Sequence, residues 1–170
     1  MAKTHLTISE RIIIEGMLNN HSSFAEIGRS VNKDRSTISR EVQNHSTEKK
    51  TGVFNRMFND CALRYNCPRF MECDKEHCNR KTCSFCSQWC GTRCPSCKQE
   101  VCKKLLAVPY VCNGCKEKGK CTLTKSIYEA CSAEKQYQKE LKESRQGIAI
   151  TEKEAKNLQS IINTVFTVLT

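Results

Sequence analysis

The sequence predicts a mainly α-helical protein, with an N-terminal three-helix domain of the helix-turn-helix type, a central irregular Cys-rich module and C-terminal helices. Residues 1–45 show helical periodicity with two capping motifs, all 14 cysteines lie in residues 61–131, and helical patterning returns in residues 132–170. Hydrophobic residues make up only 38% of the chain and aromatic residues 6%. Because so little apolar surface cannot build one large core, we expect a zinc-stabilised middle.

The N-terminal segment contains two sequences that predict helix starts. Residues 7–10 (Thr-Ile-Ser-Glu) and 23–26 (Ser-Phe-Ala-Glu) each fit a capping box, in which a hydroxyl and a glutamate satisfy the first backbone N–H groups of a helix. Apolar residues follow each motif at helical spacing, namely Ile12, Ile13, Met17 and Leu18, and then Phe24, Ile27 and Val31. The pattern therefore predicts two short amphipathic helices.

A third helix is predicted to begin near Asp34, after a tight turn at Asn32, with Ile38 and Val42 facing inward. In such a layout the last helix presents its polar side to the major groove of DNA, where arginine can bridge guanine and asparagine can pair with adenine. The residues predicted to contact DNA are Arg29, Lys33, Arg35, Ser36, Thr37, Ser39, Arg40 and Asn44. A small helical bundle with an ordinary polar surface is the alternative.

The charge distribution agrees with a polyanionic partner. The formal net charge is +10, and residues 61–131 carry 13 Lys and Arg against six Asp and Glu. This excess predicts binding to double-stranded DNA, although a basic surface without a partner gives the same count. Neither a secretory signal nor an apolar run long enough for a membrane is found, so we expect a cytoplasmic protein that does not bind membranes.

The cysteine spacing indicates metal binding. Three Cys-x-x-Cys pairs, at residues 83/86, 94/97 and 112/115, can each aim two sulfurs at one ion. A chain in a reducing compartment uses such cysteines as ligands more often than as disulfides. The predicted ligands of two or three structural zinc ions are Cys67, Cys73, Cys78, Cys83, Cys86, Cys90, Cys94, Cys97, Cys102, Cys112, Cys115 and Cys121.

The pairing of these ligands stays open, as does an iron–sulfur cluster in place of zinc. Cys112, Cys115 and Cys121 are expected to share one ion with Cys102. Cys131 lies in a helical stretch and is expected to be a packed thiol, because free cysteine behaves as a small hydrophobic residue.

The polar residues 46–60 are predicted to be a linker, and residues 132–170 a helical segment. An apolar stripe from Leu158 to Leu169 runs almost to the last residue without a cap. Such a stripe indicates either a truncated chain or a helix through which the protein forms a homo-oligomer.

Residues 24–28 (Phe-Ala-Glu-Ile-Gly) and 36–42 (Ser-Thr-Ile-Ser-Arg-Glu-Val) resemble the N-terminal domain of bacterial transposases of the insertion sequence thirty family. Residues 111–115, 121–123 and 144–148 resemble a Cys-rich subgroup of the same family. The resemblance implies a bacterial, nucleoid-associated protein whose helix-turn-helix binds the terminal inverted repeats of a mobile element. It also implies a role in DNA recombination by transposition. It also implies a following RNase H-like domain with an Asp, Asp, Glu triad.

That catalytic part is not found in this sequence. Its only aspartates are Asp34, Asp60 and Asp74, and two-metal strand transfer needs several converging carboxylates. We therefore expect a truncated transposase that binds DNA and is not an enzyme. The sequence also departs from the family at Gly28, where alanine is usual, and at Asn32, where glycine is usual; Gly28 is expected to cost about 1 kcal/mol in mid-helix.

Other functions fit parts of the same pattern. A stand-alone zinc-dependent transcriptional regulator would use the same DNA chemistry. A metal or redox sensor would act through exposed, low-pKa cysteines, and a zinc module that binds other proteins would need no DNA.

Overall fold

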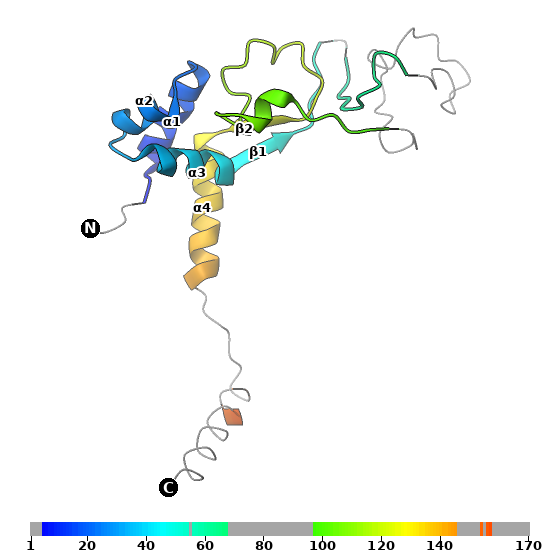
Figure 1. Ribbon diagram of the computed structural model, residues 1–170. Coiled ribbons are helices and arrows are strands. Elements are labelled where there is room, and N and C mark those ends of the chain that lie inside the picture. The colour runs from blue at the N-terminus through cyan, green and yellow to red at the C-terminus, as the bar shows by residue number, and fades with distance from the viewer. Residues whose placement is uncertain (1–4, 55, 68–96, 146–153, 155, 158–170) are drawn as a thin grey trace, which may run out of the picture. The chain divides into compact units, whose positions relative to one another are not determined.

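A computed structural model describes residues 5–54, 56–67, 97–145, 154 and 156–157 of the chain (Figure 1). The chain divides into two compact units, Met1–Gln136 and Tyr137–Thr170. The helices and strands are α1 (Ile8–Asn19), α2 (Phe24–Ser30), α3 (Arg35–His45), β1 (Ser46–Lys49), η2 (Lys103–Leu106), β2 (Lys125–Tyr128) and α4 (Ala130–Arg145). The predicted mainly α class with a three-helix N-terminal domain is confirmed.

The helix starts follow the capping motifs. Thr7 caps α1 and Ser23 caps α2, each with the reciprocal bond from a glutamate three residues on. Asp34 caps α3, and its carboxylate accepts a hydrogen bond from the Ser36 N–H at 2.7 Å. Asn32 has φ 50°, the left-handed conformation expected for the turn between α2 and α3.

The inward face of α1 differs from the predicted stripe. Ile14 and Leu18 are buried, whereas Ile12 is 56% exposed and Ile13 is 42% exposed. Arg11, a charged residue, occupies the preceding turn of the buried face and is only 1% exposed. A pattern search for apolar residues misses this face, because a buried arginine is tolerated only where its partners come from other parts of the chain.

The core of the three helices is completed by residues far along the chain. Val111, Tyr128 and Ala133 belong to the same buried cluster as the apolar residues of α1, α2 and α3. The ring of Tyr110 lies 6.3 Å from the ring of Phe24, measured between centroids. The first unit therefore includes both the helix-turn-helix and the end of the Cys-rich module, and the two do not form separate cores.

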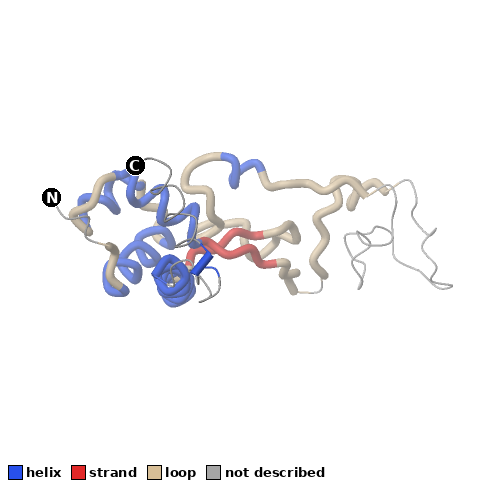
Figure 2. Tube along the Cα trace, turned by 90° about the horizontal axis from the view of Figure 1, so that it is seen from below, coloured by secondary structure: helices blue, strands red, loops and turns tan. Residues whose placement is uncertain are grey.

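A two-stranded ribbon joins these parts. β1 pairs antiparallel with β2, with Ser46 opposite Tyr128 and Lys49 opposite Lys125. Figure 2 shows the two strands next to the helices, with loops beyond their far ends. Residues 46–49, predicted as the start of a linker, thus form a strand. The linker prediction is wrong here because the pairing residues lie 76 to 82 positions away in sequence, as Thr47 opposite Ile127 illustrates.

The turn that contains Cys112 and Cys115 is docked on α1. The Asn113 amide donates to the Tyr128 carbonyl at 2.9 Å, and its oxygen accepts from the Tyr128 N–H at 2.8 Å. Gly114 fits closely, because a Cβ there would lie 2.8 Å from the Leu18 carbonyl oxygen. Only glycine allows the two backbones to approach this closely.

Two sequence expectations are corrected by local packing. Cys131 is exposed, so it is not a packed thiol, because it lies on the outer side of α4 while Ala133 faces the core. Gly28 is not a weak point of α2, since an added Cβ would lie 2.6 Å from the Lys33 carbonyl oxygen. The close approach of α2 to the start of α3 requires glycine and outweighs its low helix propensity.

Candidate nucleic-acid interface

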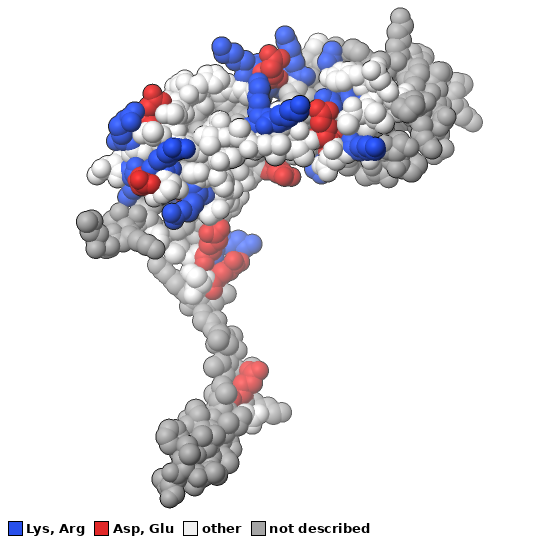
Figure 3. Space-filling model, viewed as in Figure 1, with Lys and Arg blue, Asp and Glu red and all other residues white. Residues whose placement is uncertain are grey.

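Helix α3 has two chemically distinct faces. Ile38 and Val42 are fully buried, as predicted, and Glu41 and His45 are buried beside them. The opposite face is polar and free of carboxylates, because Glu41 is the only acidic residue within the helix and it points inward. The exposed side of α3 therefore presents arginine, hydroxyl and amide groups to the solvent, as Figure 3 illustrates with basic side chains over α2 and α3.

The structure brings most of the predicted DNA-contacting residues to this surface. The exposed ones are Arg29, Arg35, Ser36, Arg40 and Asn44, and the half-buried ones are Thr37 and Ser39. These side chains lie on α3 or on the preceding helix, so they can face one ligand together. We call Arg29, Arg35, Ser36, Thr37, Ser39, Arg40 and Asn44 the α3 surface.

Lys33 behaves differently from the other predicted residues. Its ammonium lies 3.7 Å from the Glu10 carboxylate at the start of α1, and its side chain is 17% exposed. Burial acts to raise the pKa of Glu10, but hydrogen bonds from Thr7 and the charge of Lys33 lower it overall. Lys33 thus connects the turn between α2 and α3 to the start of α1, and any phosphate would compete with Glu10 for it.

Hydrogen bonds along the helix order the α3 surface. Arg40 donates to the Ser36 hydroxyl at 3.5 Å, and Gln43 donates to the Ser39 hydroxyl at 3.1 Å. Gln43 is exposed on the same face and was not among the predicted residues. Its spacing of four residues from Ser39 is the sequence signal that identifies it.

The N-terminus of α3 carries one compensated negative charge. Hydrogen bonds from Ser36 lower the pKa of Asp34, and the charges of Arg40 and Arg35 lower it further. A carboxylate at this cap satisfies the first N–H groups of the helix. It also fixes where α3 begins, and therefore which of its side chains face outward.

The only carboxylate of α3 lies in a buried ionic network. Arg11 donates to Glu41 at 2.7 Å, to the Leu6 carbonyl at 2.9 Å and to Glu134 at 2.5 Å. The Tyr128 hydroxyl donates to Glu41 at 3.0 Å, and the imidazole Nδ1 of His45 lies 3.1 Å from the other Glu41 oxygen. This network connects α1, α3, β2 and α4.

Charge and burial in this network shift two pKa values in opposite directions. Burial acts to raise the pKa of Glu41, but the hydrogen bonds from His45 and Arg11 prevail and lower it to about 2. Burial raises the pKa of Tyr128, and the neighbouring charge of Glu41 raises it further. Glu41 is therefore ionised and Tyr128 protonated at neutral pH, which is the state in which the hydroxyl donates to the carboxylate.

The Cys-rich module is described only in part. Cys73, Cys78, Cys83, Cys86, Cys90 and Cys94 lie outside the described residues. Cys115 donates its N–H to the Cys112 carbonyl at 3.2 Å in one turn. Burial raises the pKa of the Cys112 thiol, as do interactions with the thiols of Cys115, Cys102 and Cys121.

These four cysteines are the group that the sequence assigned to one ion, and Cys112 interacts electrostatically with the other three. Within the described ranges, however, no three histidine, cysteine, aspartate or glutamate side chains are arranged as a metal site. Cys67 and Cys97 are half-buried, and their predicted partners lie in residues 68–96. A zinc ion is therefore an expectation from the spacing and not a feature of the geometry.

The fold and the α3 surface define a helix-turn-helix domain, a class that indicates binding to DNA. Residues 3–45 match a family model described as a helix-turn-helix domain. The search of curated proteins found no match, and neither did the search of solved structures. Among the described helices, none combines the length and the apolar character needed to cross a bilayer.

Proposed function

We propose that this protein binds double-stranded DNA in a sequence-specific manner through α3. One observation carries the proposal: the single carboxylate of α3 is buried and neutralised, and the outer face consists of arginine, hydroxyl and amide side chains. Such groups donate to phosphates and to base edges in the major groove. The arginines at residues 35 and 40 are the strongest candidates for base contacts.

The proposed target is the terminal inverted repeat of a mobile element, as in the transposases that the sequence resembles. Helix-turn-helix domains of the matched kind occur in transposases, and the sequence resemblance extends beyond the matched residues. The three aspartates of the chain include Asp34, which caps α3, and Asp60, which is buried and accepts from Gln99. The proposed role is therefore DNA recognition without strand cleavage.

The test measures binding to a selected duplex and to a scrambled duplex of the same composition. The site would first be selected from random duplexes with the whole protein. The double variant Arg35→Ala/Arg40→Ala should lose about 10-fold to 100-fold in preference for the selected site, since one lost bidentate contact removes ~1–3 kcal/mol of discrimination. The matched control, Lys139→Ala/Lys142→Ala on α4, removes two positive charges elsewhere and should keep that preference.

Unchanged preference in the arginine variant would show that α3 does not read the sequence. A wild-type protein that binds both duplexes equally, or neither, would refute sequence-specific DNA binding itself.

We further propose that zinc stabilises the Cys-rich module, as two or three ions bound by the predicted cysteines. The support is the Cys-x-x-Cys spacing and the electrostatic interaction of Cys112 with Cys102, Cys115 and Cys121. Elemental analysis of the purified protein should find zinc. Cys112→Ser/Cys115→Ser should lower its content by one ion, whereas Cys131→Ser, which changes an exposed thiol, should not. A folded protein that contains iron or no metal would refute this proposal.

A further inference from the structure

A second basic surface lies outside the helix-turn-helix. Lys103 is exposed on η2, and Lys116, Lys118 and Lys120 are exposed on the loop that follows Cys115. Within residues 103–120 the only acidic side chain is Glu117. None of the four ammonium groups forms an ion pair with a carboxylate in the described part of the chain. We call these four residues the lysine surface.

Backbone hydrogen bonds give this loop a defined shape. The Lys118 N–H donates to the Cys115 carbonyl at 3.0 Å, and the Lys120 N–H donates to the Glu117 carbonyl at 2.9 Å. Lys104 of η2 lies 3.7 Å from the Cys115 sulfur, measured from its Nζ, so η2 and the loop are adjacent. The lysines are therefore presented together by consecutive turns.

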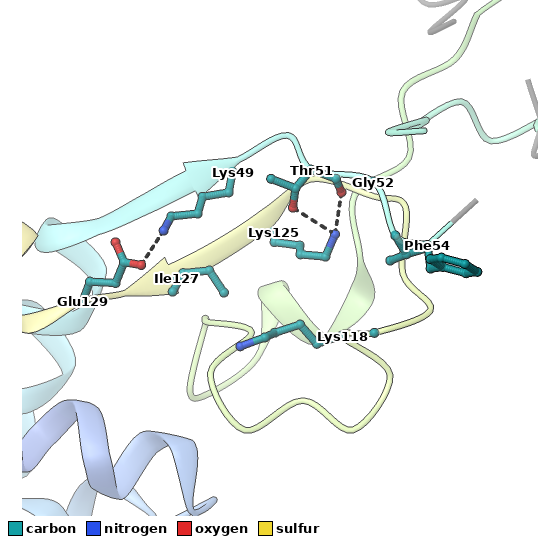
Figure 4. Close-up of a pocket in the computed structure, with 10 residues that line it drawn as sticks. Lys49, Thr51, Gly52, Phe54, Lys118, Lys125, Ile127 and Glu129 are labelled. Atoms are coloured by element: carbon teal, nitrogen blue, oxygen red, sulfur yellow. Dashed lines mark hydrogen bonds and ion pairs between the residues drawn. The ribbon is translucent and has the colours of Figure 1, made fainter. Parts of the chain in front are cut away.

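The loop and the end of the β-ribbon enclose an open hollow of about 480 Å³ (Figure 4). Two lysines at its border have internal partners: Lys49 pairs with Glu129, and Lys125 donates to the Thr51 carbonyl at 2.6 Å. Lys118 extends beneath the ribbon from the other side, while Phe54 points outward and is 91% exposed. The cations left for a ligand are thus those of the loop.

The β-ribbon connects this surface to the end of α3. Ser46 is both the C-cap of α3 and the first residue of β1, so the ribbon leaves directly from the end of the helix. Four strand residues span about 13 Å, close to the ~12 Å width of the major groove. Figure 3 shows basic side chains over α2 and α3 and also over the segment that contains η2 and the loop.

We propose that the lysine surface is a second contact site for the phosphate backbone of the same duplex. This inference rests on the proposed function, because α3 must hold the DNA for the loop to reach it. Flexible lysines without acidic partners suit phosphates, which they contact as point charges without reading the sequence. The ribbon and its loop would then contact the DNA backbone beside α3. They would add affinity, while α3 supplies the preference for a particular DNA sequence.

The experiment compares the salt dependence of binding for the whole protein and two triple variants. One variant is Lys116→Gln/Lys118→Gln/Lys120→Gln, and the matched control is Lys135→Gln/Lys139→Gln/Lys142→Gln on α4. Log affinity falls as log salt concentration rises, and each lost phosphate contact makes this slope shallower by about 0.9. The slope for the loop variant should therefore be shallower than that for the wild-type protein by up to about 2.7, on both the selected and the scrambled duplex.

When the salt concentration is raised about fourfold, the DNA affinity of the wild-type protein should therefore fall up to about 40-fold more than that of the loop variant. The ratio of affinities for the selected and scrambled duplexes should stay the same in that variant. An unchanged slope, or the same decrease in the α4 control, would refute the lysine surface while leaving sequence-specific binding by α3 intact. Circular dichroism of all three proteins confirms that the surface substitutions leave the fold unchanged.

Discussion

Replacing Glu41 by glutamine removes one negative charge from the centre of the buried ionic network and keeps the size of the side chain. Arg11 is 1% exposed and Glu41 is 7% exposed, so neither charge can be solvated by water in place of its partner. In the Glu41→Gln variant, Arg11 retains the Leu6 carbonyl and Glu134 but loses the more buried of these two carboxylate partners. Breaking a buried ion pair from one side is costly, because the remaining charge stays buried.

The pKa of Glu41 gives the size of the effect. The pKa falls from 4.5 in the unfolded chain to about 2 in the folded protein, and each pH unit corresponds to ~1.4 kcal/mol. The ionised carboxylate therefore contributes on the order of 3 kcal/mol to the free energy of unfolding. Because the folded pKa is the lower one, this contribution is complete above about pH 4.5 and is lost as the pH falls towards 2.

Urea unfolding followed by far-ultraviolet circular dichroism, at several pH values between about 7 and 2.5, measures this contribution. Wild type should exceed Glu41→Gln by about 3 kcal/mol at neutral pH, and the difference should shrink at acid pH. Taking the difference cancels changes that both proteins share, including any loss of metal in acid. Glu48→Gln, at an exposed glutamate of β1, is the matched control and should change stability little.

A Glu41→Gln protein as stable as wild type would refute the reasoning. So would a difference that stays constant down to pH 2.5, because the carboxylate would then not be the titrating group.

Four further substitutions test the packing and hydrogen bonding of the first unit, each by urea unfolding. Gly28→Ala should destabilise the protein by about 1–3 kcal/mol, because its Cβ would lie 2.6 Å from the Lys33 carbonyl, whereas Gly16→Ala has nothing within 4 Å and should stabilise α1 by about 0.5–1 kcal/mol. Equal effects at the two glycines would contradict this. Gly114→Ala should also destabilise the protein by about 1–3 kcal/mol, since the turn that contains Cys112 and Cys115 can no longer dock on α1. A Gly114→Ala variant as stable as wild type would show that this docking is loose. Tyr128→Phe removes one hydrogen bond to the buried glutamate and should cost about 1 kcal/mol; no loss would mean that water or another donor replaces the hydroxyl.

Local signals in the sequence predicted the three helices well. The capping motifs at Thr7 and Ser23 and the turn at Asn32 depend on hydrogen bonds or conformations within a few residues, so they can be read without knowing the fold. The inward positions Ile38 and Val42 follow from helical spacing in the same way. Sequence reasoning therefore identified the residues of the α3 surface, but it missed Gln43, which is exposed beside them on the same helix.

The parts that were missed depend on distant residues. Arg11 reads as a surface residue until Glu41 and Glu134 are placed beside it. The strand at residues 46–49 has no apolar alternation of its own, and its partner lies beyond the Cys-rich module. Gly28 was expected to destabilise α2, because helix propensity takes no account of the close approach of the Lys33 carbonyl.

The completion of the helical core by Val111, Tyr128 and Ala133 has a consequence for synthesis of the chain on the ribosome. After His45 has been added, translation must continue through Ala133 before the missing side of the core exists, a delay on the order of 10 s at about 5–20 residues per second. During that time the nascent helices expose apolar surface, and β1 has no partner strand. Chaperone binding to stalled nascent chains should therefore persist until Ala133 has been added, and the proposed DNA binding by α3 should begin only after residues 46–133 have been made.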